Sequence, residues 1–188
     1  MVSASSLESA RFAGEMRATM GMVLISDLAL AKECIHVYRE SARQAGWEPA
    51  AENILIGMHT VIAETDDEAR AALAQARKYF DGVLMGGMRT AGRLVLQKTR
   101  FYRDPANRER MQNRLAKREA ATMDEQIAGG MILCGSPESV VRQIRRIHGE
   151  LGHGVFNFTM KVGDLPDAVV RRGMELFRDR VLPHVRDL

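Results

Sequence analysis

The sequence has few of the residues that mark several large classes of protein. Two cysteines, Cys34 and Cys134, cannot form a disulfide scaffold in a chain of 188 residues, which favours a reducing, cytoplasmic setting. No Cys–His pair has the spacing of metal ligands, so we predict no metal site. No apolar run approaches the roughly 20 residues that cross a bilayer, and no signal peptide opens the chain, so we expect no membrane partner.

Aromatic residues are also scarce, at 5%, which bears on the one strongly charged segment. Between residues 88 and 122 the chain has ten basic residues against three acidic ones. Such a segment can bind phosphates, anionic substrates or nucleic acid, or it can be a solvated face that pairs with the acidic remainder. Because few aromatic residues are interleaved for base stacking, we predict no nucleic-acid partner.

The chain alternates short apolar runs with amphipathic segments, the pattern of an α/β fold with parallel strands. Strands are predicted over Met20–Ile25, Asn53–Ala63 and Val155–Met160, with a short apolar run at Met131–Cys134. A first helix is predicted over Leu7–Ala18, behind a Ser5–Glu8 capping box. Further helices are predicted after Ser26 or Asp27, from Thr65 to Phe80 or beyond, and after Ser136. A last helix is predicted from near Asp164, and its inward-packed residues are Val170, Met174, Phe177 and Val181.

The two faces of the predicted strands differ. One face of the second strand carries Ile54, Ile56, Met58 and Ile62, and the other carries Leu55, Gly57, His59 and Val61. The third strand likewise places Phe156 and Phe158 opposite Asn157 and Thr159. A parallel barrel produces this division, because its apolar face packs against outer helices while the other face looks inward.

No catalytic triad, phosphate-binding loop or metal motif is present. Serines near residue 6 lie at a helix start that can bind an anion such as a flavin or nucleotide phosphate, although plain capping also explains them. His59 is either an acid–base or cofactor-contacting group or a core histidine with ordinary partners. Helix-start electrostatics accounts for Asp66, and we interpret Cys134 as a small core residue. His148, His153 and His184 suit ordinary surface roles.

Five segments, in order, resemble the bacterial luciferase-like, flavin-dependent monooxygenases. They are S-A-S-S-L-E-S-A-R-F-A, M-V-L-I-S, V-I-A-E-T-D-D-E-A, C-G-S-P-E-S-V-V-R-Q-I and G-D-L-P-D-A-V-V-R-R-G-M-E-L-F-R-D-R-V-L-P-H-V. The resemblance covers nearly the whole chain. It implies one domain, residues 1–188, that forms the last three βα units of a TIM-type (β/α)8 barrel plus a mostly helical, basic, lid-like insertion at about 83–128.

The resemblance also implies a cofactor and its contacts. The cofactor is reduced FMN, or the deazaflavin F420 as the alternative, used with O₂ on a small organic substrate. Ser6 and Ser9, with Ser5 adjacent, match the family's hydroxyls that hold the flavin phosphate. Arg89 and Arg93 are candidates for contacting an anionic group from the lid. Apart from the resemblance, His59 is the catalytic candidate that its place on a strand suggests.

A typical barrel of this type needs about 250 residues, so a partial barrel leaves two open strand edges. We therefore expect a homo-oligomer or a partner chain that completes the barrel, with a flavin reductase as a candidate electron supplier. The explanations left open are an incomplete, truncated gene, a subunit completed by oligomerisation, and a non-catalytic partial barrel that binds flavin or a protein partner.

Overall fold

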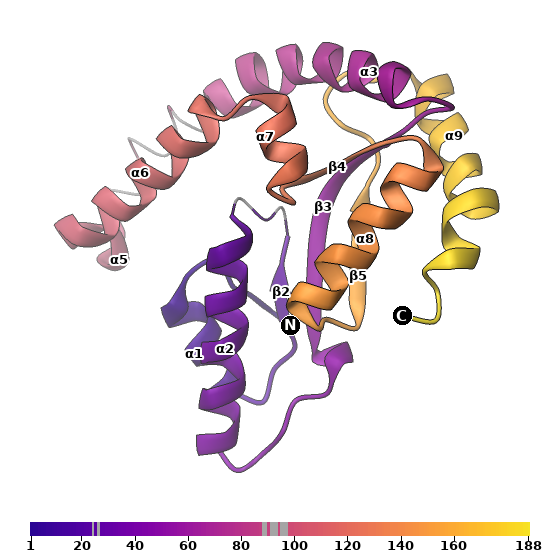
Figure 1. Ribbon diagram of the computed structural model, residues 1–188. Coiled ribbons are helices and arrows are strands. Elements are labelled where there is room, and N and C mark those ends of the chain that lie inside the picture. The colour runs from indigo at the N-terminus through magenta and orange to yellow at the C-terminus, as the bar shows by residue number, and fades with distance from the viewer. Residues whose placement is uncertain (24, 26, 88–89, 91–93, 95–97) are drawn as a thin grey trace.

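The structure is a computed structural model that describes residues 1–23, 25, 27–87, 90, 94 and 98–188. One parallel sheet forms its centre, and helices pack against the sheet (Figure 1). Its strands are β1 (Val2–Ser3), β2 (Met20–Met22), β3 (Ile54–Ile62), β4 (Ile132–Gly135) and β5 (Val155–Thr159). Every pairing between these strands is parallel, as the alternation of strands and helices predicts.

The pairing registers fix the order of the strands. Leu55 and Ile56 of β3 pair with both β2 and β5, so these two strands lie on opposite edges of β3. His59 pairs with both β4 and β5, so β4 lies on the same edge as β2, beyond the end of β2. The sheet therefore runs β1-β2-β3-β5 in chain order, as consecutive strands of a parallel barrel do, and β4 extends one edge of β3.

Strand β1 adds a fourth βα unit to the three that the sequence predicts. Val2 and Ser3 pair with Met20 and Gly21 of β2. Two residues are too short to show any hydrophobic period, so no pattern in the sequence could have indicated this strand. The fold class is nevertheless as predicted: an α/β partial barrel with a parallel sheet.

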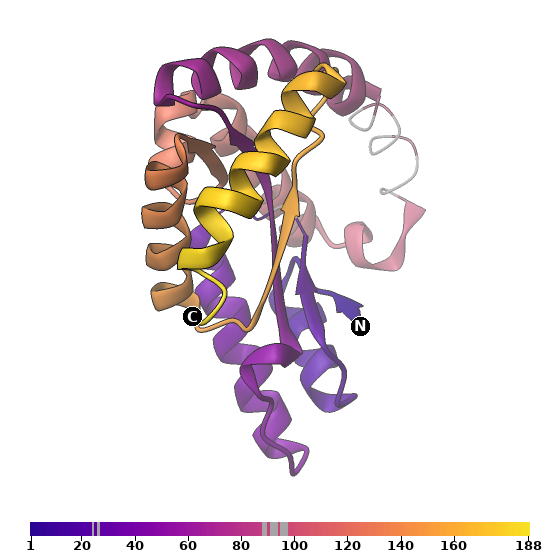
Figure 2. The ribbon, with the colours of Figure 1, turned by 90° about the vertical axis from the view of Figure 1, so that its right-hand side faces the viewer.

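The helices cover the sheet on its flanks and at its carboxyl end. Their bounds are α1 (Leu7–Glu15), α2 (Leu28–Gln44), α3 (Asp66–Tyr79), α5 (Arg100–Arg103), α6 (Pro105–Ala120), α7 (Met123–Ala128), α8 (Pro137–Leu151) and α9 (Asp167–Leu176). Figure 1 shows α1 and α2 on one flank and α9 on the opposite flank, with α3 across the carboxyl ends of the strands. In Figure 2 β3 and β5 run side by side, and α9 crosses in front of them.

Two predicted elements extend further than the observed ones, and one helix cap is now fixed. Helix α1 ends at Glu15 rather than Ala18, and Arg17 then takes a positive φ of 53°. Strand β2 ends at Met22 rather than Ile25. Asp27, not Ser26, caps α2, because its carboxylate accepts hydrogen bonds from the first-turn N–H groups.

The predicted apolar face of β3 forms the main core. Ile54, Ile56 and Met58 are fully buried, together with side chains from α1, α2 and α8. The close approach of α1 to α2 needs Gly14, because a Cβ there would lie 2.6 Å from the Tyr38 carbonyl oxygen. The prediction of Met174 as a core residue is wrong: it is 51% exposed, because α9 turns Gly173 and Leu176 toward the sheet instead.

A second, smaller core lies at the carboxyl end of the sheet. Val61 of β3 packs there with Leu73 of α3, Ile127 of α7 and Val162 of the segment after β5. Helices α3 and α7 therefore close the top of the inner face. Within the described ranges, no helix is both long enough and apolar enough to cross a membrane.

Candidate functional site

The serines at the start of α1 bond to one another. Ser6 is the N-cap, and its Oγ accepts a hydrogen bond from the Ser9 N–H at 3.3 Å. In return the Ser9 Oγ accepts one from the Ser6 N–H at 3.1 Å and donates one to the Ser6 carbonyl at 2.9 Å. The capping box is therefore Ser6–Ser9 rather than the predicted Ser5–Glu8, because Ser6 has the extended backbone and the side-chain acceptor of an N-cap.

This helix start lies at the carboxyl end of β1, the end at which barrel enzymes bind their ligands. The first-turn N–H groups of a helix point along its axis, out of its N-terminus, and attract anions. Among the described residues, no carboxylate is hydrogen-bonded to Ser6 or Ser9. Arg110 of α6 approaches Glu8 at 3.9 Å, which places part of the basic segment beside this start.

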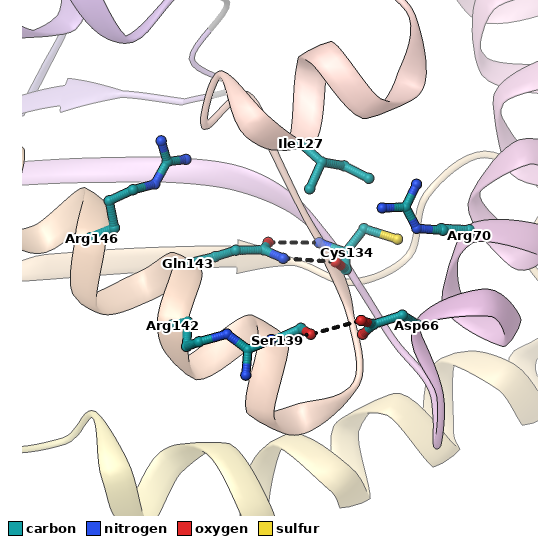
Figure 3. A pocket seen from close by; sticks show the side chains of 8 residues that line it. All are labelled: Asp66, Arg70, Ile127, Cys134, Ser139, Arg142, Gln143 and Arg146. Atoms are coloured by element: carbon teal, nitrogen blue, oxygen red, sulfur yellow. Dashed lines mark hydrogen bonds between the residues drawn. The ribbon is translucent and has the colours of Figure 1, made fainter.

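The start of α8 has the same spacing of serines but a different partner. Ser136 is its N-cap, and its N–H donates to Asp66 Oδ1 at 2.6 Å. The Ser139 hydroxyl donates to Asp66 Oδ2 at 2.9 Å (Figure 3). These bonds, that from the Ser136 N–H first and that from Ser139 second, lower the pKa of the Asp66 carboxyl. Asp66 belongs to the first turn of α3, so its carboxylate joins the starts of two helices.

Glycine at position 135 makes room for this carboxylate. Gly135 has a φ of +148°, and a Cβ built on it would lie 2.7 Å from Asp66 Oδ1. The interpretation of Asp66 through the electrostatics of its own helix start is therefore incomplete. Its bonds to Ser136 and Ser139 span 70 and 73 residues of sequence and have no local signal.

A small polar cavity of about 260 Å³ lies between α3, α7 and α8 beside this junction. Its lining residues are Asp66, Arg70, Ile127, Cys134, Ser139, Arg142, Gln143 and Arg146 (Figure 3). The Gln143 amide bonds both the N–H and the carbonyl of Cys134, at 3.1 and 2.9 Å, and so occupies the outer edge of β4 at that residue. Burial raises the pKa of the Cys134 thiol to about 12, which agrees with a small core residue and not with a nucleophile.

His59 lies on the inner face of β3, under the segment that follows α3. It is 7% exposed, and its ring meets the Phe80 ring edge-on at 4.8 Å between centroids. The other predicted inner residues lie nearby in register: Gly57 pairs with Asn157, and His59 with Thr159. Packing against Phe80 favours the core interpretation of His59 over direct access to a ligand.

A family of known proteins shares this arrangement of strands and helix starts. The family model described as luciferase-like monooxygenase matches residues 1–153. The chain belongs to the luciferase-like monooxygenase family. A search of the curated proteins finds no match.

Solved structures of luciferase-like fold agree with the partial barrel. Monooxygenase RslO1 from Streptomyces bottropensis is 23% identical, with a TM-score of 0.67, over 97% of this chain and 46% of that one. The oxygenating constituent of 3,6-diketocamphane monooxygenase from Pseudomonas putida, in complex with FMN, is 22% identical, with a TM-score of 0.68, over 94% and 45%. The coenzyme F420 dependent tetrahydromethanopterin reductase from Methanopyrus kandleri is 18% identical, with a TM-score of 0.53, over 97% and 49%.

The luciferase-like chain therefore spans about half the length of the solved structures that it matches. At these identities the likeness shows the fold alone. Of the predicted insertion at 83–128, the described part includes α5, α6 and α7. Arg89 and Arg93 lie outside the described residues.

His153 is buried, so the prediction of an ordinary surface role for it is wrong. Its side chain is 2% exposed, and neither ring nitrogen has a hydrogen-bond partner among the residues that the structure describes. Burial, followed by the charge of the neighbouring His148, lowers the pKa of His153 to about 4. The sequence placed His153 at a helix end but could not show that Phe156 covers it, with the two rings 4.8 Å apart.

No metal-binding cluster is found in the described part of the chain. Among those residues, no three His, Cys, Asp or Glu side chains gather as metal ligands would.

Proposed function

We propose that this protein acts as a flavin-dependent oxidoreductase, a monooxygenase that uses reduced flavin and O₂ on a small organic substrate. Membership of the luciferase-like family supports the reaction class. The observation that carries the proposal is the start of α1, a serine-capped helix N-terminus at the carboxyl end of a barrel strand.

The cofactor that fits this start is FMN, with coenzyme F420 as the alternative. Both carry a phosphate, and an anion there would meet the N–H groups of the first turn together with the Ser6 and Ser9 hydroxyls. The Ser9 hydroxyl can exchange its bond to the Ser6 carbonyl for one to the phosphate, since a hydroxyl rotates freely. Ser5, exposed and adjacent, would add a third hydroxyl.

When bound, the reduced flavin supplies the electrons that activate O₂. The residues of this chain would bind the flavin, orient it and shield it from water. Ser6 and Ser9 would hold the phosphate and thereby set how far the flavin ring extends from the start of α1. Helices α3 and α7 pack over the carboxyl end of the inner face and exclude water there. His59 holds Phe80 in place, and we propose it as a group that shapes the pocket floor.

The basic segment that contains α5 and α6 would serve as a lid, a role for which we also propose Arg89 and Arg93. The contact of Arg110 with Glu8 supports a position near the phosphate. We further propose that a flavin reductase supplies the reduced cofactor and that a further chain completes the barrel. The buried, unbridged cysteines support a reducing, cytoplasmic setting.

Flavin binding tests the proposal directly. The purified chain is titrated into FMN while flavin fluorescence is followed, and then supplied with a flavin reductase and NADH while O₂ uptake is measured with candidate substrates. We expect saturable fluorescence change with FMN. A chain that leaves the fluorescence unchanged at tens of micromolar would overturn the flavin assignment.

A second candidate is a non-catalytic subunit that binds flavin. It is favoured by one observation, the span of about half the length of the matched structures. The same titration separates the two functions: a subunit of this kind binds FMN but does not couple O₂ uptake to consumption of any substrate.

A further inference from the structure

The sheet ends in two strand edges that no described strand covers. Strand β1 pairs only with β2, and β5 pairs only with β3, within the described part of the chain. An uncovered edge presents N–H and carbonyl groups that can pair with another strand. At Cys134 of β4, by contrast, the Gln143 side-chain amide bonds the backbone N–H and carbonyl that a neighbouring strand would otherwise pair with.

Exposed apolar side chains lie on the helices that follow the two edge strands. Beside β1, Phe12 of α1 is 51% exposed and Met16, directly after α1, is 60% exposed. On the flank of the sheet that α9 covers, Met174 of α9 is 51% exposed, and Leu182, which follows the π-helical turn Phe177–Val181, is 40% exposed. Figure 1 shows α1 and α9 on opposite flanks of the sheet. Large apolar side chains grouped at both ends of one sheet indicate surfaces that are covered in the working protein.

We propose that a second copy of this chain covers both flanks and closes an eight-stranded parallel barrel. All four barrel strands point the same way, so a twofold axis parallel to them preserves strand direction. Under that rotation β5 of each copy lies beside β1 of the other, in parallel. Two sets of four strands give eight, the number that closes a barrel filled by its own side chains.

The same rotation brings the apolar flanks together. In each of the two joints, the α9 flank of one copy with Met174 and Leu182 meets the α1 flank of the other with Phe12 and Met16. Both joints form at once and are identical, so the assembly stops at two chains instead of growing into a fibre. A dimer that pairs α1 with α1 would leave the edge of β5 and the α9 flank uncovered, which makes it the poorer arrangement.

This inference rests on the proposed function, because a closed barrel would enclose the flavin at the carboxyl ends of its strands. It also names the partner: the chain that completes the barrel is another copy of this one. The site of each copy would then include the inner face of both sheets.

Sizing by light scattering tests the assembly without any flavin. We expect the protein to have the mass of a dimer in solution, twice the 21.0 kDa of one chain. The double variant Phe12→Glu/Met16→Glu should raise the dissociation constant at least about 100-fold, and Met174→Glu about tenfold or more. Val83→Glu is the matched control, since Val83 is 59% exposed and lies outside both flanks, in the π-helical turn Phe80–Leu84.

Mixing the two flank variants decides the geometry. Each variant alone spoils both joints, whereas an equimolar mixture can form dimers in which one joint is wholly wild type. We therefore expect the mixture to recover dimer that neither variant forms alone. Circular dichroism of each variant checks that it has folded.

Three results would overturn the inference: a monomeric wild type at about 100 μM, a dimer that survives both flank variants, or a mixture with no recovered dimer. An α1–α1 dimer would survive Met174→Glu and is thereby recognised. A monomer that binds FMN overturns the closure and leaves the proposed function standing. A dimer that binds no flavin overturns the proposed function and leaves the closure of the barrel standing.

Discussion

The first turns of helices α1 and α8 have the same pattern of serines but different hydrogen-bond partners. Each follows a parallel strand, and each has serine at its cap and again three residues on, Ser6 and Ser9 in α1 and Ser136 and Ser139 in α8. At α8 the Asp66 carboxylate accepts from the Ser136 N–H and the Ser139 hydroxyl. At α1 the two serines bond only to each other in the described structure.

The difference separates a structural junction from a candidate ligand site. A carboxylate of the chain already provides the negative charge that the α8 N-terminus attracts, and it ties α3 to α8 in doing so. The start of α1 has no such internal anion hydrogen-bonded to its serines among the residues described. The same sequence pattern therefore predicts stability at one helix and phosphate binding at the other.

Removing the internal anion should have the largest effect on stability. Asp66→Ala leaves the Ser136 N–H and the Ser139 hydroxyl without their acceptor and should lower the free energy of unfolding by about 2 kcal/mol. Asp67→Ala, one residue along the same exposed helix start, should cost less than about 0.5 kcal/mol. Urea denaturation measures both. Equal losses for the two variants would contradict the junction.

The far end of α8 extends the comparison, because His153 just beyond it is a buried group with no hydrogen-bond partner in the described part of the chain. Its pKa of about 4 lies below the ordinary 6.5, so as the pH falls the unfolded chain takes up a proton before the folded one. The stability present above pH 6.5 is thus lost progressively toward pH 4. Between about pH 7 and about pH 5 the loss should be about 2 kcal/mol.

His153→Phe should abolish that loss, because the variant has no group to titrate there. His184→Gln, at an exposed histidine, is the matched control and should keep the wild-type dependence. Denaturation midpoints at about pH 7, 6 and 5 measure the slope. A His153→Phe chain with the wild-type slope would show that His153 is not the group responsible.

The capping serines themselves should have smaller and similar effects at the two helices. Ser6→Ala and Ser136→Ala each remove an acceptor for a first-turn N–H and should each cost about 1 kcal/mol of stability. Thermal melts compare them. A much larger loss for Ser136→Ala than for Ser6→Ala would contradict the expected similarity of the two caps.

Local patterns were enough to predict much of this fold. The apolar face of β3 and the helix starts at Thr65 and after Ser136 are as predicted, because each depends on residues a few positions apart. Strand β1 was missed because two residues carry no period. The serine cluster was located correctly, although the cap itself is Ser6.

What the sequence could not supply are contacts between distant segments. The bonds from Asp66 to the start of α8 join residues 70 and more positions apart. The burial of His153 beneath Phe156 and the exposure of Met174 likewise depend on how helices settle on the sheet. These are tertiary effects, which neither spacing nor propensity encodes.

The most direct test of the account compares FMN with riboflavin, which lacks the phosphate. In the wild type we predict that FMN binds at least about tenfold more tightly than riboflavin, by fluorescence titration. The Ser6→Ala/Ser9→Ala variant should lose this preference, whereas Ser139→Ala, the equivalent change at α8, should keep it. Loss of the preference only in the α1 variant is the predicted result, and an unchanged preference in that variant would contradict the account.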